Sequence, residues 1–82
     1  MKQFEKLGTL ANAILHNLEK GDKRLKDLRE LLKKEGLSFQ PYTVSIVLQR
    51  LKKKGYVNNF TRGVWRITSK GKKYLKFIRG GR

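Results

Sequence analysis

The stretch PYTVSIVLQRLKKKGYVNNFTRGVWRIT, residues 41–68, changes its hydrophobic period at Gly55. Before Gly55, apolar residues recur at three- and four-residue steps, which predicts a helix over 41–54. Pro41 suits the first turn of this helix, where no amide hydrogen is needed, and Gly55 is typical of a residue that ends one. The apolar positions expected in the core are Val44, Val47, Leu48 and Leu51.

After Gly55 the period becomes that of a strand. Residues 56–60 and 64–68 are rich in β-branched and aromatic side chains, and the turn residues between them include Gly63. The sequence therefore predicts a β-hairpin over 56–68. Alternation along its second strand favours Trp65 as a core residue, although an exposed tryptophan could also serve as a platform for stacked bases.

Two helices are predicted before this stretch. The first covers residues 3–19, with Gly8 in its interior. The second lies within residues 24–35, with Asp22 as a possible N-cap. Alternatively, Arg24 and the next residue form a short extended segment, and the helix begins two residues later.

A last short helix is expected at about residues 70–79, capped by Thr68 or Ser69, with a flexible tail at 80–82. The predicted order is three helices, a hairpin and a helix in one domain over 1–79. The fold class is therefore mainly α with a small β-hairpin.

These segments resemble the winged helix family. TVSIVLQRLKKKGYV (43–57) resembles its recognition helix and the exit into the wing, and GVWRITSKGKKYL (63–75) resembles its return strand and final helix. TRGVWRITSKGKKYL (61–75) is particularly similar to the N-terminal winged helix of Mrr-type restriction endonucleases. The resemblance implies a three-helix helix-turn-helix core, a two-stranded wing and a C-terminal helix. The resemblance implies no cleavage activity, because the nuclease domain of that family is not in this sequence.

The charges of the chain indicate a polyanionic partner. Among 82 residues, 21 are Lys or Arg and 6 are Asp or Glu, which gives a net charge of +15. All the acidic residues lie before residue 36, so residues 36–82 are basic and free of acid. A surface with one sign of charge repels itself, and this arrangement favours a protein that binds nucleic acid.

The outward face of the 41–54 helix and the hairpin supply the candidate contacts to double-stranded DNA. Gln49 and Ser45 are expected to read base edges, Arg50 to read guanine or bind phosphate, and Ile46 to touch a thymine methyl group. The remaining side chains are expected to bind the DNA backbone, with the hairpin on flanking backbone or in the minor groove. They are Tyr42, Lys52, Lys53, Lys54, Arg62 and Arg66.

Several classes of function are not expected. The acidic residues form no paired-carboxylate or metal-ligand pattern, and the chain has no cysteine, so we expect no enzyme activity, no metal and no cofactor. We also expect no membrane association, and a cytoplasmic, nucleoid-associated protein that regulates transcription. The alternatives are a ribosomal or RNA-binding winged helix protein and a module that docks an acidic protein.

A homodimer is a further expectation. The last helix carries a wide apolar arc that includes Tyr74, Phe77 and Ile78. With Leu10 and Ile14 of the first helix it could form a dimer seam, as in winged helix regulators that read two half-sites. A monomer whose last helix only covers the core is the alternative.

Overall fold

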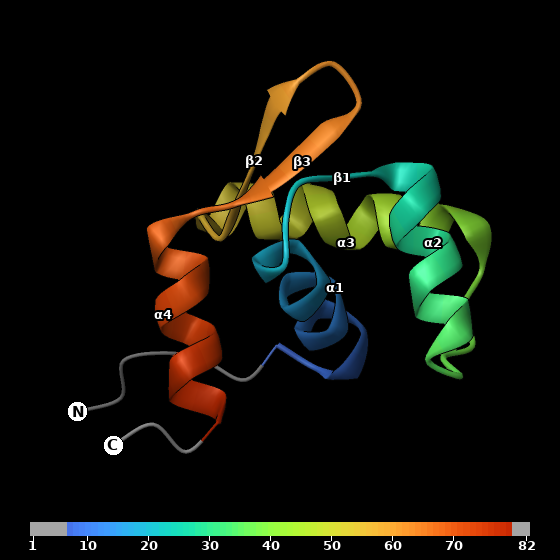
Figure 1. The fold of residues 1–82 in the computed structure, drawn as a ribbon, viewed down its shortest axis with the longest axis horizontal. Coiled ribbons are helices and arrows are strands. Elements are labelled where there is room, and N and C mark those ends of the chain that lie inside the picture. Colours follow the sequence, from blue (N-terminus) through green and yellow to red (C-terminus); the bar gives the residue numbers. More distant parts are fainter. Residues whose placement is uncertain (1–6, 80–82) are drawn as a thin grey trace.

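The computed structural model describes residues 7–79, and its element order confirms the predicted fold class. Four helices pack beside a small antiparallel sheet. The last two strands of this sheet in chain order form a hairpin that projects from the molecule (Figure 1). The elements in chain order are α1 (Thr9–Glu19), β1 (Lys23–Arg24), α2 (Leu25–Lys34), α3 (Pro41–Lys54), β2 (Val57–Thr61), β3 (Val64–Ile67) and α4 (Ser69–Ile78).

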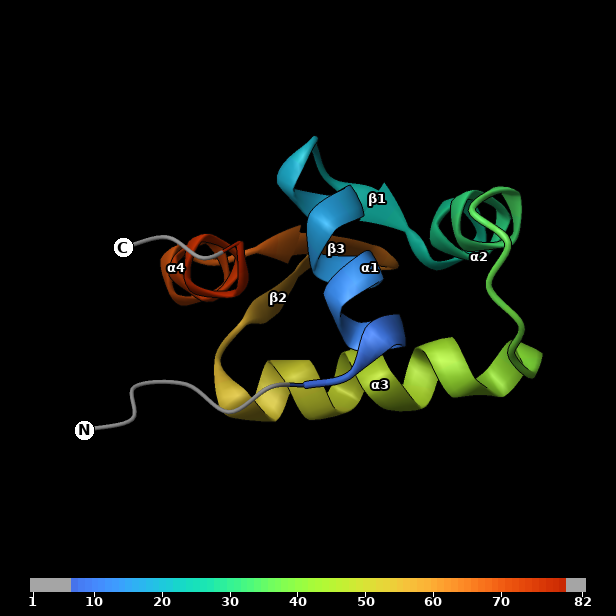
Figure 2. The same ribbon diagram turned by 90° about the horizontal axis from the view of Figure 1, so that it is seen from below.

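The sheet has the strand order β1-β3-β2, with both pairs antiparallel. β3 is therefore the central strand, with Trp65 opposite Lys23 on one side and Asn59 on the other. Figure 2 shows β2 at the edge of the sheet nearer α3 and β1 at the far edge. β2 is thus the strand of the hairpin that lies nearer α3.

The hydrophobic core forms around α1, which contacts α2, α3, α4 and β3. Trp65 is only 7% exposed, so its interpretation as a core residue is confirmed. The fully or nearly fully buried apolar side chains come from all four helices and the sheet: Ala11, Ile14, Leu15, Leu18, Leu28, Leu32, Val44, Leu48, Leu51, Tyr56, Val57, Trp65, Ile67, Tyr74 and Leu75.

The first helix begins later than predicted. α1 starts at Thr9, and Gly8 precedes it with φ at +103°, a backbone conformation that a helix interior does not contain. The prediction of Gly8 as an interior helical residue was therefore wrong. Residues 3–6 of the predicted helix, like the predicted tail at 80–82, lie outside the described residues.

The segment between α1 and α2 contains a short extended stretch, as in the alternative prediction, but one residue earlier than predicted. Lys23 and Arg24 form a short strand, and α2 begins at Leu25 with Arg24 in extended conformation as its N-cap residue. Asp22 is thus not the N-cap. Its carboxylate instead forms an ion pair with Arg66 of β3, a contact across 44 residues that local sequence could not reveal.

The end of α3 and the start of α4 are joined by hydrogen bonds. The Thr68 hydroxyl donates to the Gly55 carbonyl oxygen at 2.6 Å and accepts from the Gly71 amide at 3.2 Å, which confirms Thr68 as the N-cap of α4. The Lys70 ammonium donates to the Lys54 carbonyl oxygen at 2.8 Å. Because helix ends leave carbonyl groups without partners inside the helix, these bonds fix the end of α3 against the hairpin and α4.

Candidate nucleic-acid interface

α3 presents one face to the core and the other to solvent. Val44 and Leu48 are 0% exposed, whereas Tyr42 is 64% and Ile46 46% exposed on the opposite side. Gln49 is exposed on that outward side as well. Figure 2 shows α3 along one side of the molecule, with the other elements packed on a single side of it. Among residues 7–79, no other element packs against its outer face.

The other predicted residues of α3 flank this face. Ser45 is half-buried, while Arg50, Lys52 and Lys53 are exposed. Lys54, also exposed, lines an open and mostly apolar pocket of about 330 Å³ between α3 and the start of α1, and Arg50 lines it as well. The first turn of α3 contains no acidic residue, so its positive dipole end is not neutralised from within the helix.

The hairpin places Arg62 in the exposed turn between β2 and β3. The turn is stabilised from inside, because the Asn59 amide group donates to the carbonyl oxygens of Thr61 at 3.2 Å and Val64 at 2.9 Å. Arg62 thus lies in a turn held by hydrogen bonds, at the tip of the hairpin that projects beyond the helices in Figure 1.

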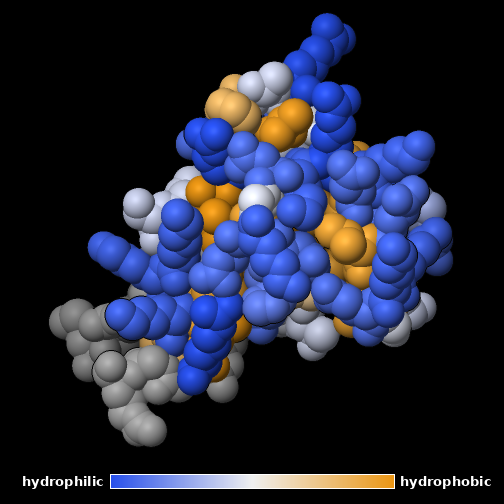
Figure 3. Space-filling model, viewed as in Figure 1, coloured by the Kyte–Doolittle hydropathy of each residue, from blue (hydrophilic) through white to orange (hydrophobic). Residues whose placement is uncertain are grey.

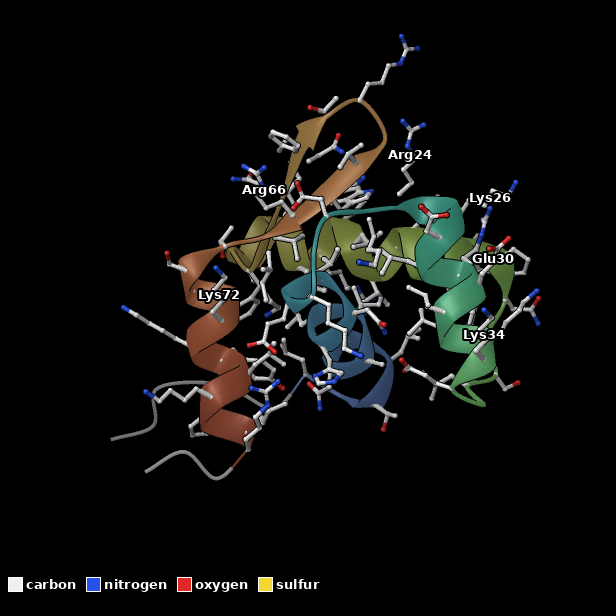
Figure 4. The ribbon with its side chains drawn as sticks, viewed as in Figure 1. Arg24, Lys26, Glu30, Lys34, Arg66 and Lys72 are labelled. Atoms are coloured by element: carbon white, nitrogen blue, oxygen red, sulfur yellow. The ribbon has the colours of Figure 1, made fainter. Side chains whose placement is uncertain are left out.

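Arg66 differs from the other predicted contacts, because it is already engaged within the protein. Its Nε and one terminal nitrogen donate to the two carboxylate oxygens of Asp22 at 3.2 and 3.0 Å. Its guanidinium carbon lies 3.7 Å from the centre of the Phe60 ring. The Asp22 carboxylate raises the pKa of Arg66 above its ordinary value, chiefly through this hydrogen bond. Figure 4 shows Arg66 on the outside of the sheet.

One basic residue beside the hairpin was missed in the sequence. Arg24 is exposed and lies opposite Val64, on the face of the sheet that points away from the core (Figure 4). The signal was the possible extended segment before α2, but only its pairing with β3 brings Arg24 next to the hairpin. Arg24 therefore adds positive charge to the same region as Arg62.

The charged surfaces of α1 and α2 carry both signs of charge. Along α2, Lys26, Glu30 and Lys34 follow one another at four-residue steps with alternating sign (Figure 4). On α1, Glu19 forms an ion pair with Arg79. The hydrogen bond that Arg79 donates to the Glu19 carboxylate lowers the pKa of Glu19. These mixed surfaces are typical of a solvated face, in contrast to α3 and the hairpin, whose own residues include no acidic one.

The proposed dimer seam is smaller than the sequence indicated. Tyr74 and Ile14 are 0% exposed, so including them in a seam was wrong. The Tyr74 hydroxyl accepts from the Leu7 amide at 2.9 Å and donates to Asn12, and these bonds hold the ring inside its own chain. Phe77 remains 36% exposed, and Ile78 is half-buried.

Within residues 7–79, no group of His, Asp or Glu side chains could hold a metal ion. In the same part of the chain, no helix combines the length and the apolar character needed to cross a bilayer.

Solved structures resemble this fold closely. A PadR-family transcription regulator from Clostridium difficile superposes with a TM-score of 0.78 at 20% identity, over 89% of this chain and 85% of the regulator. A transcriptional regulator from Clostridium thermocellum gives a TM-score of 0.74 at 24% identity, over 87% and 77% of the two chains. At these identities the similarity establishes the winged helix fold. No protein-family model matches the chain, and no curated protein is significantly similar in sequence. The similarity of residues 61–75 to Mrr-type nucleases stays a sequence resemblance.

Proposed function

We propose that this protein is a transcription regulator that binds double-stranded DNA with α3 in the major groove and the hairpin on flanking backbone or in the minor groove. The observation that carries the proposal is the outer face of α3, which is exposed, carries both polar and apolar side chains and is free of acidic residues. The major groove is about 12 Å wide, so it admits a helix and displays a distinct pattern for each base pair. The two regulators of the same fold support this function.

Side chains on this face and beside it can read sequence. The Gln49 amide can pair with adenine through two hydrogen bonds, and Ser45 can bond to either kind of base edge. Ile46 is 46% exposed, and its apolar surface suits the methyl group of thymine. Arg50, beside them, can bind guanine or a phosphate.

The side chains that we expect to contact phosphate lie on either side of these base-reading residues. Tyr42 is 64% exposed near the positive end of α3, where a phosphate oxygen is favoured. Lys52, Lys53 and Lys54 lie in the last turn, and Arg62 extends from the hairpin. Such charges give affinity and orientation rather than sequence preference.

We also propose that the protein forms a homodimer on DNA and associates with the nucleoid. The exposed part of Phe77, the neighbouring Ile78 and the half-buried Leu10 of α1 supply an apolar surface for a second copy. Two copies would read half-sites about one helical turn apart.

Selection of bound duplexes from a random pool tests the proposal. We expect an enriched sequence, and Gln49→Ala and Ser45→Ala should reduce the preference for it over other sequences. Lys53→Ala is the matched control on the same helix. It should weaken binding to all duplexes about equally and reduce the slope of log Kd against log salt concentration by about 1. If Gln49→Ala and Lys53→Ala changed binding in the same way, the assignment of base-reading residues would be wrong.

A competition assay tests the class of nucleic acid. We expect a selected duplex to displace structured RNA at about 150 mM salt, where nonspecific ionic binding is weak. Preferential binding of the RNA would instead favour the RNA-binding alternative. Absence of duplex binding even at low salt would contradict the proposed function altogether.

A further inference from the structure

Phe60 is an exposed aromatic residue at an irregularity of the hairpin. The pairing of β2 with β3 runs through Asn59 and resumes at Thr61, so that Phe60 is the extra residue of a β-bulge. Its side chain is 52% exposed, and Figure 3 shows hydrophobic atoms on the hairpin within a mostly hydrophilic surface. Bulges commonly redirect a side chain next to a functional site.

The exposed ring is supported from beneath by a charged pair. Arg66 lies 3.7 Å from the ring centre, and both carboxylate oxygens of Asp22 hold its guanidinium in place. A guanidinium stacked on an aromatic face is a favourable arrangement, and an ion pair with two hydrogen bonds restricts its orientation. Asp22 therefore acts on Phe60 through Arg66.

Phe60 lies on the strand of the hairpin that is nearer α3. That strand is β2, which contacts α3. Among the described residues, the exposed large apolar side chains are Tyr42, Ile46, Phe60 and Phe77. Two of these lie on α3, and Phe60 lies on the hairpin two residues before Arg62.

We propose that Phe60 makes an apolar contact with the deoxyriboses and base edges of the minor groove beside the site of α3, and that Arg66 and Asp22 position its ring. This inference rests on the proposed binding of duplex DNA. Minor-groove proteins commonly insert apolar side chains, Phe among them, into that groove, and such a contact neutralises no phosphate. Arg66 then supports an aromatic contact and does not itself bind phosphate.

Salt dependence distinguishes this contact from an ionic one. On a selected duplex, Phe60→Ala should weaken binding about tenfold at every salt concentration, because the lost contact is apolar. The plot of log Kd against log salt should therefore shift in parallel. Arg62→Ala should instead reduce the slope of this plot by about 1, since one phosphate contact is lost. Phe60→Leu should retain part of the affinity, and Thr61→Ala, the matched control at an exposed neighbour, should bind as the unaltered protein does.

A double-mutant cycle tests the positioning role of Asp22. Asp22→Asn should weaken DNA binding in the otherwise unaltered protein and should have little further effect when combined with Phe60→Ala. Thermal unfolding of each variant, monitored by circular dichroism, separates this coupling from loss of structure. Additive effects of the two substitutions would overturn the positioning role.

The remaining outcomes also decide the proposal. Unchanged affinity in Phe60→Ala would show that the ring does not contact DNA. A shallower salt dependence in that variant would show an ionic role for this part of the hairpin, and would overturn the apolar contact. Absence of duplex binding by the unaltered protein would instead reject the proposed function, so the two failures are distinguishable.

Discussion

Gly71 shows how a single position can be fixed by packing. It is buried in the first turn of α4, and a Cβ atom built on it would lie 2.4 Å from the Tyr56 carbonyl oxygen and 2.6 Å from Cγ1 of Ile67. Both distances are shorter than real carbon contacts allow. The helix can therefore approach the end of the hairpin only because this residue has no side chain.

Gly71→Ala should lower the free energy of unfolding by about 3 kcal/mol, because the backbone oxygen of Tyr56 cannot move aside cheaply. Urea unfolding measures the change. The matched control is Lys73→Ala, at an exposed position of the same helix, and its effect should stay within about 0.5 kcal/mol. Equal stability of Gly71→Ala and the unaltered protein would mean that α4 packs less closely than described.

Arg66 shows which properties of a single side chain the local sequence predicts and which it does not. Its alternation with Trp65 predicted that it points outward, and it does. The sequence could not reveal that Asp22 and Phe60 contact it, since one partner is 44 residues away and the other is the extra residue of a bulge in the neighbouring strand. A side chain's direction follows from local period, but its partners depend on the fold.

α3 is the element that the sequence determined best. The predicted bounds, 41–54, agree with the observed helix, because Pro41 begins it and Gly55 ends it with φ at +88°. The α1–α2 segment was predicted less well. β1 has only two residues and exists because it pairs with β3, so no local period could predict it with certainty.

The junction of α3 with α4 depends on the Thr68 hydroxyl, which binds both the Gly55 carbonyl oxygen and the Gly71 amide. Thr68→Ala should lower the free energy of unfolding by about 1–2 kcal/mol, since an N-cap and a second bond are lost. Thr68→Ser keeps the hydroxyl and should remain close to the unaltered protein in the same chemical denaturation experiment. If serine destabilised the protein as much as alanine, the methyl group rather than the hydroxyl would matter.

At the scale of the whole molecule, the fold separates the charges. Acidic residues of α1 and α2 pair with basic ones or alternate with them, whereas α3 and the hairpin themselves contain no acidic residue, and the Asp22 carboxylate beside the hairpin is paired with Arg66. The total charge of +15 indicated only a polyanionic partner. The arrangement of that charge around α3 is what favours a duplex with a groove.

Self-association is a property of the whole molecule as well. If two copies pair through Phe77 and its neighbours, Phe77→Ser should weaken the dimer about tenfold, because the apolar area buried between copies is reduced. Sedimentation velocity over a range of protein concentrations measures this, with Lys76→Ser as the matched control on the same helix. A monomer at every concentration, in both the unaltered protein and the variants, would contradict the dimer.

The sequence by itself determined the long periodic elements, the inward face of α3, the core position of Trp65 and the acid-free half of the chain. These properties depend on neighbours three or four residues apart in a helix, or two apart in a strand, so they can be read locally. Only the tertiary structure decided the start of α1, the burial of Tyr74, the pairing of β1 and the support of Phe60 by Arg66 and Asp22. Each of these depends on contacts between segments distant in the chain, which exist only once the core has formed.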